Sequence, residues 1–199
     1  TQELIKIEDD YFINTFTRQP IVLDHGEGVK VTDIDGNEYI DMFAGIAVNA
    51  LGHNHPKLVK AIQNQAEKLI HISSIYYNEP ALIYAKKLVD LTSFDRIFYA
   101  NSGAEANEGA IKLAVKYTGK SEVISTVESF HGRTVMTLAA TGHEHYHEPF
   151  KSILPKGFIN VPYNDIEAIK EELDVSFSSA SLNGYIIDSG KLMELFFIA

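Results

Sequence analysis

The chain of 199 residues has no cysteine, no tryptophan and few arginines. Without cysteine it can form neither a disulfide framework nor a thiolate centre, which fits an intracellular protein. Arginine occurs only at Arg18, Arg96 and Arg133, and acidic residues outnumber Lys and Arg by 27 to 17, which gives a formal net charge of -10. An excess of negative charge argues against nucleic acid or an anionic membrane as a partner.

Long apolar runs are also missing. No stretch approaches the roughly 20 apolar residues of a membrane-spanning helix, and residues 1–10 lack the apolar core of a signal peptide. The 45% apolar content is typical of globular proteins. We therefore expect a soluble, cytoplasmic protein, although residues 192–199 are apolar except for Glu194 and predict some tendency to associate.

The first part of the chain predicts a small α+β segment followed by helices. Residues 3–16 have an amphipathic helical pattern, and short alternating runs at 21–23, 29–31 and 38–40 predict strands. Asp35 and Gly36 between the last two runs predict a hairpin turn. Apolar spacing then predicts helices from Pro56 to Leu69 and from Pro80 to Leu91.

The second part alternates between short apolar strands and helices. Strands are predicted at 97–100, 122–126 and 158–161, and helices at 104–117, 134–140 and 164–173. This α/β alternation predicts a mostly parallel sheet flanked by helices. Ligands of such folds bind at the carboxyl ends of the strands.

A candidate anion site occurs at one of these strand ends. The segment NSGAEANE at residues 101–108 follows a predicted strand and opens a helix. Ser102, Gly103 and Ala104 offer backbone N–H groups, a hydroxyl and the positive end of the helix dipole, so they predict a phosphate site, with an ordinary helix cap as the alternative. The segment has neither the Gly-Lys-Ser/Thr ending nor the spaced glycines of nucleotide-binding loops. Glu105, one turn into the helix, favours a structural capping role.

Several motifs in order resemble the class III (ornithine/acetylornithine-type) aminotransferases, in their N-terminal portion only. These are GVKVTDIDGNEYID at 28–41, LGHNHP at 51–56, the phosphate segment, SFHGRT at 129–134 and GF at 157–158. The resemblance implies the PLP-dependent transferase (aspartate aminotransferase-like) fold, here as a truncated, mostly parallel sheet. It also implies a homodimer that transfers an amino group from an acetylornithine- or ornithine-like donor to 2-oxoglutarate.

The resemblance further implies pyridoxal 5′-phosphate (PLP) as the cofactor. Ser102, Gly103 and Ala104 would hold its phosphate, and Phe130 would lie against its pyridine ring. Without the resemblance, Phe130 would be interpreted as a core residue.

Two residues are implied to contact the substrate. Arg133 would bind its α-carboxylate, because a guanidinium offers two parallel donors and stays charged; a surface ion pair is the alternative. Tyr76 resembles a residue of the family's substrate pocket, which often reaches across a dimer, although packing explains it equally well.

The family's catalytic lysine and the aspartate that pairs with the pyridine nitrogen are not recognisable here. Lys191 lacks the flanking glycines that the family places after its lysine. We expect an N-terminal segment at 1–50, the first half of the PLP-binding domain at 51–174 and a divergent tail at 175–199. The chain is thus predicted to be inactive or severely impaired alone; the alternative is a non-catalytic fragment that binds PLP or a partner.

Histidines offer a competing hypothesis. His143, His145 and His147 alternate, and on an extended segment they could present imidazoles to zinc. No distant fourth ligand stands out, and the segment corresponds to a variable surface loop in the family. No metal site is predicted, and His53 and His55 are interpreted as turn or interface residues.

Overall fold

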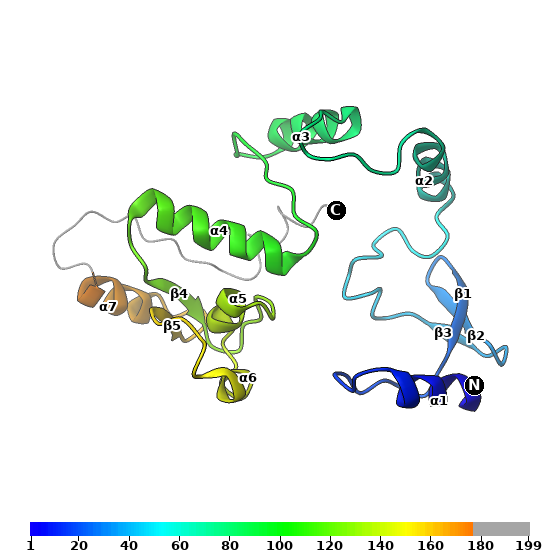
Figure 1. Cartoon of the computed structure of the whole chain (residues 1–199), viewed down its shortest axis with the longest axis horizontal. Helices are drawn as coiled ribbons and strands as arrows, with labels where there is room; N and C mark the ends of the chain where they lie inside the picture. Colours follow the sequence, from blue (N-terminus) through cyan, green and yellow to red (C-terminus); the bar gives the residue numbers. More distant parts are fainter. Residues whose placement is uncertain (177–199) are drawn as a thin grey trace. The chain divides into compact units, whose positions relative to one another are not determined.

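The structure is a computed structural model, and it describes residues 1–176 (Figure 1). The chain divides into two compact units, residues 1–78 and residues 79–199. The tail at 177–199, with Lys191, lies outside the described residues.

The first unit contains a three-stranded antiparallel sheet. Its elements are α1 (Gln2–Tyr11), β1 (Leu23–Glu27), β2 (Lys30–Asp33), β3 (Glu38–Ile40) and α2 (Pro56–Lys68). β2 lies between β1 and β3, and it pairs with β3 from Lys30↔Ile40 to Thr32↔Glu38. Gly36 in the connecting turn has a φ of 85°, so the predicted hairpin is confirmed and its glycine has a conformational reason. The proline at the start of α2 suits a first helical turn, whose N–H groups lack intrahelical partners.

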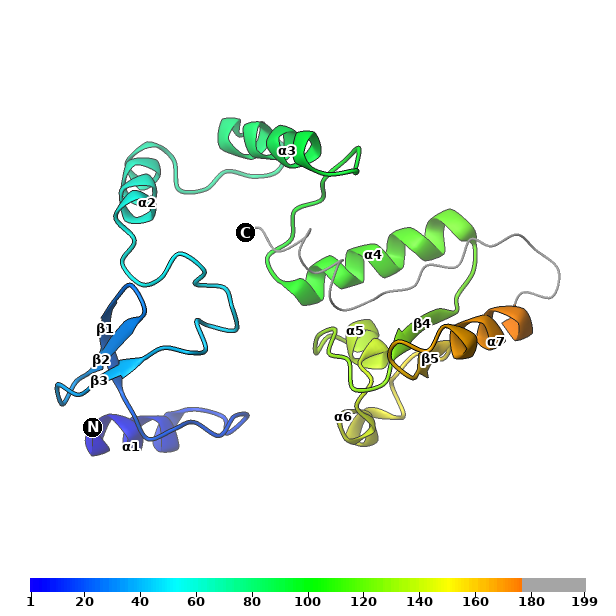
Figure 2. The same ribbon diagram turned by 180° about the vertical axis from the view of Figure 1, so that it is seen from behind.

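The second unit has a parallel strand pair surrounded by helices (Figure 2). Its elements are α3 (Glu79–Leu91), α4 (Gly103–Thr118), β4 (Val123–Thr126), α5 (Val135–Ala140), α6 (Glu144–His147), the 3-10 turn η1 (Glu148–Phe150), β5 (Phe158–Val161) and α7 (Ile166–Ser176). β4 and β5 pair in parallel from Val123↔Phe158 to Thr126↔Val161.

The core of this unit lies between α4 and the strand pair. Ile111 of α4 is packed with Val123 of β4, and Met136 and Phe158 pack against this cluster. All four residues of β4 are buried, as expected for a parallel strand covered on both faces. The predicted helix–strand–helix–strand order from 104 to 161 is thereby confirmed.

One local prediction is wrong. Residues 97–100 form no strand within the described part of the chain, although their composition is that of one. A strand needs a hydrogen-bonding neighbour, and none of the described strands pairs with this segment. Residues 144–147 form the short helix α6, in which Tyr146 N donates to His143 O, so they lack the extended form that the zinc hypothesis assumed.

Within residues 1–176, no helix combines the length and the apolar character needed to cross a membrane. The predicted divisions at residues 50 and 174 stay predictions.

Candidate functional site: a phosphate turn beside an aromatic and arginine loop

The N-terminus of α4 is an intact helix cap. Ser102 is the N-cap residue, and its Oγ accepts from Glu105 N at 3.2 Å. The Glu105 carboxylate accepts from Asn101 N at 2.7 Å and from Asn101 Nδ2 at 2.9 Å. Glu105 therefore has the structural role expected from the sequence. Gly103 and Ala104 fall in the first turn, where backbone N–H groups have no intrahelical acceptor and can bind an anion.

The segment after β4 carries the second predicted motif. His131 N donates to Thr141 Oγ1 at 3.0 Å, which ties the segment to the end of α5. Phe130 is 45% exposed. The guanidinium carbon of Arg133 lies 5.6 Å from the centre of the Phe130 ring, within cation–π range.

Gly132 brings the two motifs together. It has a φ of 135°, and a Cβ atom on it would lie 2.7 Å from the Cβ of Ala104. Real Cβ atoms do not approach so closely, so only glycine allows this loop to contact the first turn of α4. The predicted phosphate residues Ser102, Gly103 and Ala104 thus adjoin the loop that carries Phe130 and Arg133.

A pocket of about 290 Å³ opens beside this loop. Sequence reasoning missed most of its wall, which is built from α5, α6 and the following turn. Its lining residues are mainly apolar: Phe130, Gly132, Arg133, Val135, Leu138, Tyr146, Phe150, Ile153 and Leu154. The one signal for this wall in the sequence was the three-residue spacing of Val135 and Leu138, which places both side chains on one face of α5.

The first turn of α4 contacts the Phe-His-Gly-Arg loop, and this arrangement is consistent with the family that the sequence resembles. The class-III aminotransferase family matches residues 12–185. The chain belongs to this family. Family membership implies pyridoxal 5′-phosphate as the cofactor, which confirms the expectation from the sequence.

Curated relatives and solved structures agree with this membership. The chain is 56% identical over 171 residues to the acetylornithine aminotransferase of Methanothermobacter thermautotrophicus, covering 86% of this chain and 44% of the relative. Its fold is similar to the ornithine aminotransferase of Toxoplasma gondii, with a TM-score of 0.80 and 28% identity, over 87% of this chain and 42% of that one. Acetylornithine aminotransferase from Elizabethkingia anophelis gives a TM-score of 0.69 at 31% identity, over 87% and 41% of the two chains. The aminotransferase fold is confirmed, and the chain spans less than half the length of these relatives.

Tyr76, the other residue that the resemblance places in the substrate pocket, lies in the first unit. Its side chain is 67% exposed, and its N–H donates to Ser73 O at 3.0 Å in a turn. The two units are separate bodies, so the role of Tyr76 in the substrate pocket stays a prediction.

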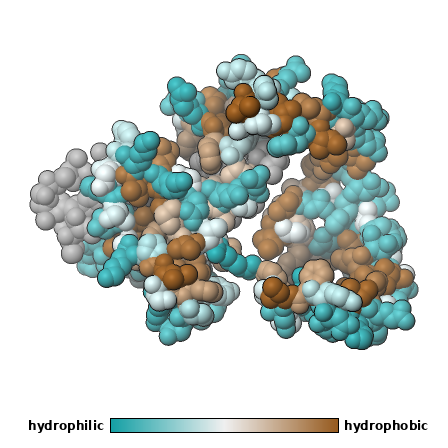
Figure 3. Space-filling view, in the orientation of Figure 1, coloured by the Kyte–Doolittle hydropathy of each residue, from teal (hydrophilic) through white to brown (hydrophobic). Residues whose placement is uncertain are grey.

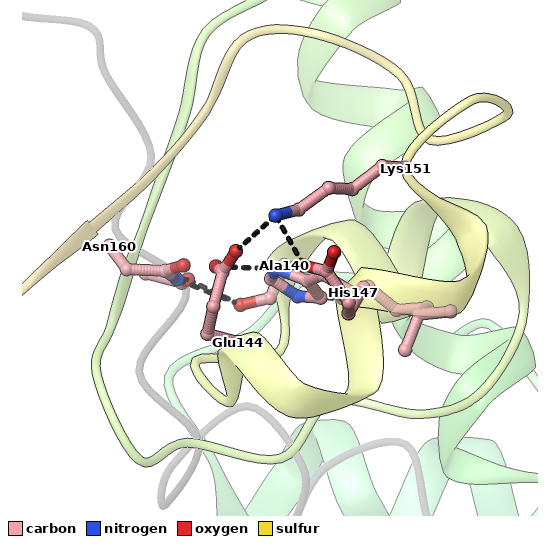
Figure 4. Close-up of polar contacts among 8 residues, drawn as sticks. Ala140, Glu144, His147, Lys151 and Asn160 are labelled. Atoms are coloured by element: carbon pink, nitrogen blue, oxygen red, sulfur yellow. Dashed lines mark hydrogen bonds and ion pairs between the residues drawn. The ribbon is translucent and has the colours of Figure 1, made fainter.

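The three imidazoles of the histidine segment do not converge on one point. His143 and His145 contact one another and Tyr146, with ring centres 5.6 and 5.5 Å from His143. His147 turns away: its Nε2 lies 2.9 Å from Leu138 O, and its Nδ1 lies 3.6 Å from Glu144 (Figure 4). Among residues 1–176, no group of three His, Cys, Asp or Glu side chains could hold a metal ion.

His53 is a structural residue of a loop in the first unit. Its Nε2 lies 2.8 Å from Asp41 Oδ2, while Asp41 Oδ1 accepts from the N–H groups of Phe43 and Ala44. The hydrogen bond with His53 is the main reason why the pKa of Asp41 is lowered. The interpretation of His53 as a turn residue is consistent with these contacts.

Proposed function

We propose that the chain forms the phosphate-binding part of a PLP-dependent aminotransferase that moves an amino group from an acetylornithine- or ornithine-like donor to 2-oxoglutarate. The observation that carries the proposal is the close approach of Gly132 to Ala104, which joins the phosphate turn to the Phe130–Arg133 loop. Relatives named acetylornithine aminotransferase support the choice of donor.

The proposed roles follow from the geometry of the two motifs. Backbone N–H groups at Ser102, Gly103 and Ala104 hold the phosphate, assisted by the helix dipole. Phe130 would lie against the pyridine ring. When bound, PLP supplies an electron sink for amino-group chemistry, and the protein supplies binding and orientation.

Arg133 and the adjoining pocket are proposed to bind the substrate. The guanidinium pairs with a carboxylate through two parallel hydrogen bonds. Apolar side chains around it, such as Leu138 and Ile153, suit the aliphatic part of an amino-acid donor. Tyr76 of the first unit stays a predicted substrate contact.

On its own, the chain is proposed to bind the cofactor without completing turnover, because no lysine of the family's Schiff-base pattern is recognisable. The second candidate function is a non-catalytic fragment that binds PLP or a partner. The homodimer and the cytoplasmic location expected from the sequence stay predictions.

Binding of pyridoxamine 5′-phosphate tests the cofactor site. This form carries an amine in place of the aldehyde, so it cannot form Schiff bases with surface lysines. Equilibrium dialysis should show binding to the wild-type chain that inorganic phosphate displaces. Phe130→Ala should weaken it about tenfold, whereas Ser121→Ala, at an exposed site on another loop, should not. A wild-type chain that does not bind would overturn the proposal.

Turnover separates the two candidate functions. Glutamate formation from acetylornithine and 2-oxoglutarate should be undetectable with the 199-residue chain and PLP. A rate comparable to that of a full-length relative would show that the chain contains a working lysine, and would refute the claim of inactivity.

A further inference from the structure

We propose that Asn107 and Glu108 of α4 are positioning residues that hold Phe130 and Arg133 in register with the phosphate turn. The identity of the ligand, PLP, rests on the proposed function. The hydrogen bonds that position the loop are contacts within the protein and do not depend on it. Neither residue was singled out from the sequence.

Asn107 holds the first half of the loop. Its side chain is 3% exposed, and its Nδ2 donates to His131 O at 2.8 Å. A buried amide needs such a partner, since leaving it without one costs about 1–3 kcal/mol. The accepting carbonyl belongs to the residue between Phe130 and Gly132, so this hydrogen bond sets the height of the loop above α4.

Glu108 holds the second half. Its Oε1 accepts from Thr134 Oγ1 at 2.6 Å and from Met136 N at 3.2 Å. The N–H of Met136 lies in the first turn of α5, where a carboxylate is favoured by the helix dipole. Glu108 therefore fixes both the end of the loop and the beginning of the next helix.

One helix therefore positions both the phosphate turn and the Phe130–Arg133 loop. α4 provides the phosphate turn at its N-terminus, and one turn later two consecutive side chains hold the loop on either side of Gly132 and Arg133. Thr141 adds a brace from α5 through its hydrogen bond with His131 N. Sites held by packed helices keep their geometry better than sites on unsupported loops, which is what binding of phosphate, ring and carboxylate at once requires.

The experiment compares variants that differ in single hydrogen-bonding groups of the full chain. Asn107→Asp keeps the shape but loses the N–H donor, because an ionised carboxylate only accepts. Glu108→Ala loses both acceptor contacts, whereas Glu108→Gln keeps an acceptor oxygen in the same place. Lys116→Ala, at an exposed position on the same helix, is the control.

Two readouts are needed: the dissociation constant of pyridoxamine 5′-phosphate, and hydrogen exchange of the backbone amides at 131–136 without ligand. We expect Asn107→Asp and Glu108→Ala to weaken binding about tenfold and to speed loop exchange, with exchange in the core of α4 unchanged. Glu108→Gln should restore both readouts to within about twofold of wild type.

Each outcome decides the matter. Loop exchange at the wild-type rate in both Asn107→Asp and Glu108→Ala overturns the inference, as does faster exchange with unchanged affinity. If Asn107→Asp fails to fold, the comparison of Glu108→Ala with Glu108→Gln decides alone. A wild-type chain that protects its loop amides but does not bind the probe refutes the proposed function and leaves the positioning contacts intact.

Discussion

Asp33 is the most heavily hydrogen-bonded carboxylate of the first unit. It is 6% exposed, and its oxygens accept from Asp35 N at 3.0 Å, Asn37 N at 2.8 Å and Tyr39 Oη at 2.8 Å. These donors close the turn between β2 and β3. The side chain of Asn37 contributes most to lowering the pKa of Asp33 from 3.8 to about 2, and the same carboxylate raises the pKa of Tyr39.

The stability of the hairpin should therefore depend on pH in a defined window. Because the pKa in the folded state lies below the ordinary value, ionised Asp33 stabilises the hairpin fully above 3.8, and the contribution is lost as the pH falls through about 2. A carbon-detected NMR titration of the Asp33 carboxyl should give a midpoint near 2. Asn37→Ala should move it upward, and a wild-type midpoint at 3.8 would show that the donors do not act as described.

Gly132 offers a second test at the scale of one residue. In Gly132→Ala the new methyl group would lie 2.6 Å from Thr137 Oγ1 and 2.7 Å from Ala104 Cβ, so the loop must move away from α4. We expect a loss of stability of about 2 kcal/mol or more and weaker binding of pyridoxamine 5′-phosphate.

Gly119→Ala is the matched control, because Gly119 also has a positive φ, of 70°, but nothing lies within 4 Å of the added methyl group. It should lose only about 1 kcal/mol in urea unfolding, without a change in affinity. Equal losses in the two variants would mean that backbone strain, and not the contact with Ala104, explains the glycine.

Among the elements, those with a local signal were predictable from the sequence. α4 has Ser102 as an N-cap and Gly119 as a left-handed C-cap, and both ends fall within one or two residues of the expected positions. Residues 97–100 were mistaken for a strand because strand formation depends on a distant partner that local composition does not reveal.

The same distinction holds for the site. Ser102 and Phe130 belong to recognisable motifs, so the sequence identifies them. Asn107 and Glu108 have partners 24 to 28 residues away, two of which are backbone atoms whose positions no local pattern specifies. Both residues lie in the NSGAEANE segment, but that motif does not identify their partners. The one further signal is the amide of Asn107 on the buried face of α4, between Ala106 and Ile111.

A small hydrogen-bond network joins three elements of the second unit. Ser125 of β4 is fully buried, and its Oγ donates to Ala140 O at 2.5 Å at the end of α5. Asn160 of β5 donates to Ser125 Oγ at 2.5 Å and to Ala140 O at 3.2 Å (Figure 4). Because Ser125 both donates and accepts, it links the parallel strand pair to the helix between them.

Removal of this hydroxyl should weaken the link between β4, α5 and β5. Ser125→Ala leaves Asn160 with only the longer contact, so we expect a loss of about 1–2 kcal/mol in the free energy of unfolding. Amides of β5 should exchange faster in the variant. Ser121→Ala, at an exposed position just before β4, should change neither the free energy of unfolding nor the exchange of the β5 amides. An unchanged midpoint of unfolding in Ser125→Ala would argue that water replaces the hydroxyl.

At the scale of the molecule, much apolar surface is left open. Within the part of the chain that the structure describes, α2 and α3 bury no residue. Ile62 of α2 is 61% exposed and Leu82 of α3 is 56% exposed, and brown apolar patches reach the surface in both units (Figure 3). Amphipathic helices obtain most of their stability from a packed apolar face, so these two helices need a cover.

The chain matches 44% of the Methanothermobacter relative, and the part of that relative beyond the match is the first candidate to test as a cover. We expect the remaining C-terminal portion of that enzyme, expressed separately, to co-elute with this chain in size-exclusion chromatography. Binding should lower the fluorescence of an apolar dye, because α2 and α3 lose exposed surface, and it should tighten the binding of pyridoxamine 5′-phosphate. Mixing with Gly132→Ala should reduce dye fluorescence equally but give weaker cofactor binding, since that substitution displaces only the loop beside α4. If the portions do not co-elute and the dye signal stays constant, the open faces have another partner, and a second copy of the chain becomes the next candidate to test by light scattering.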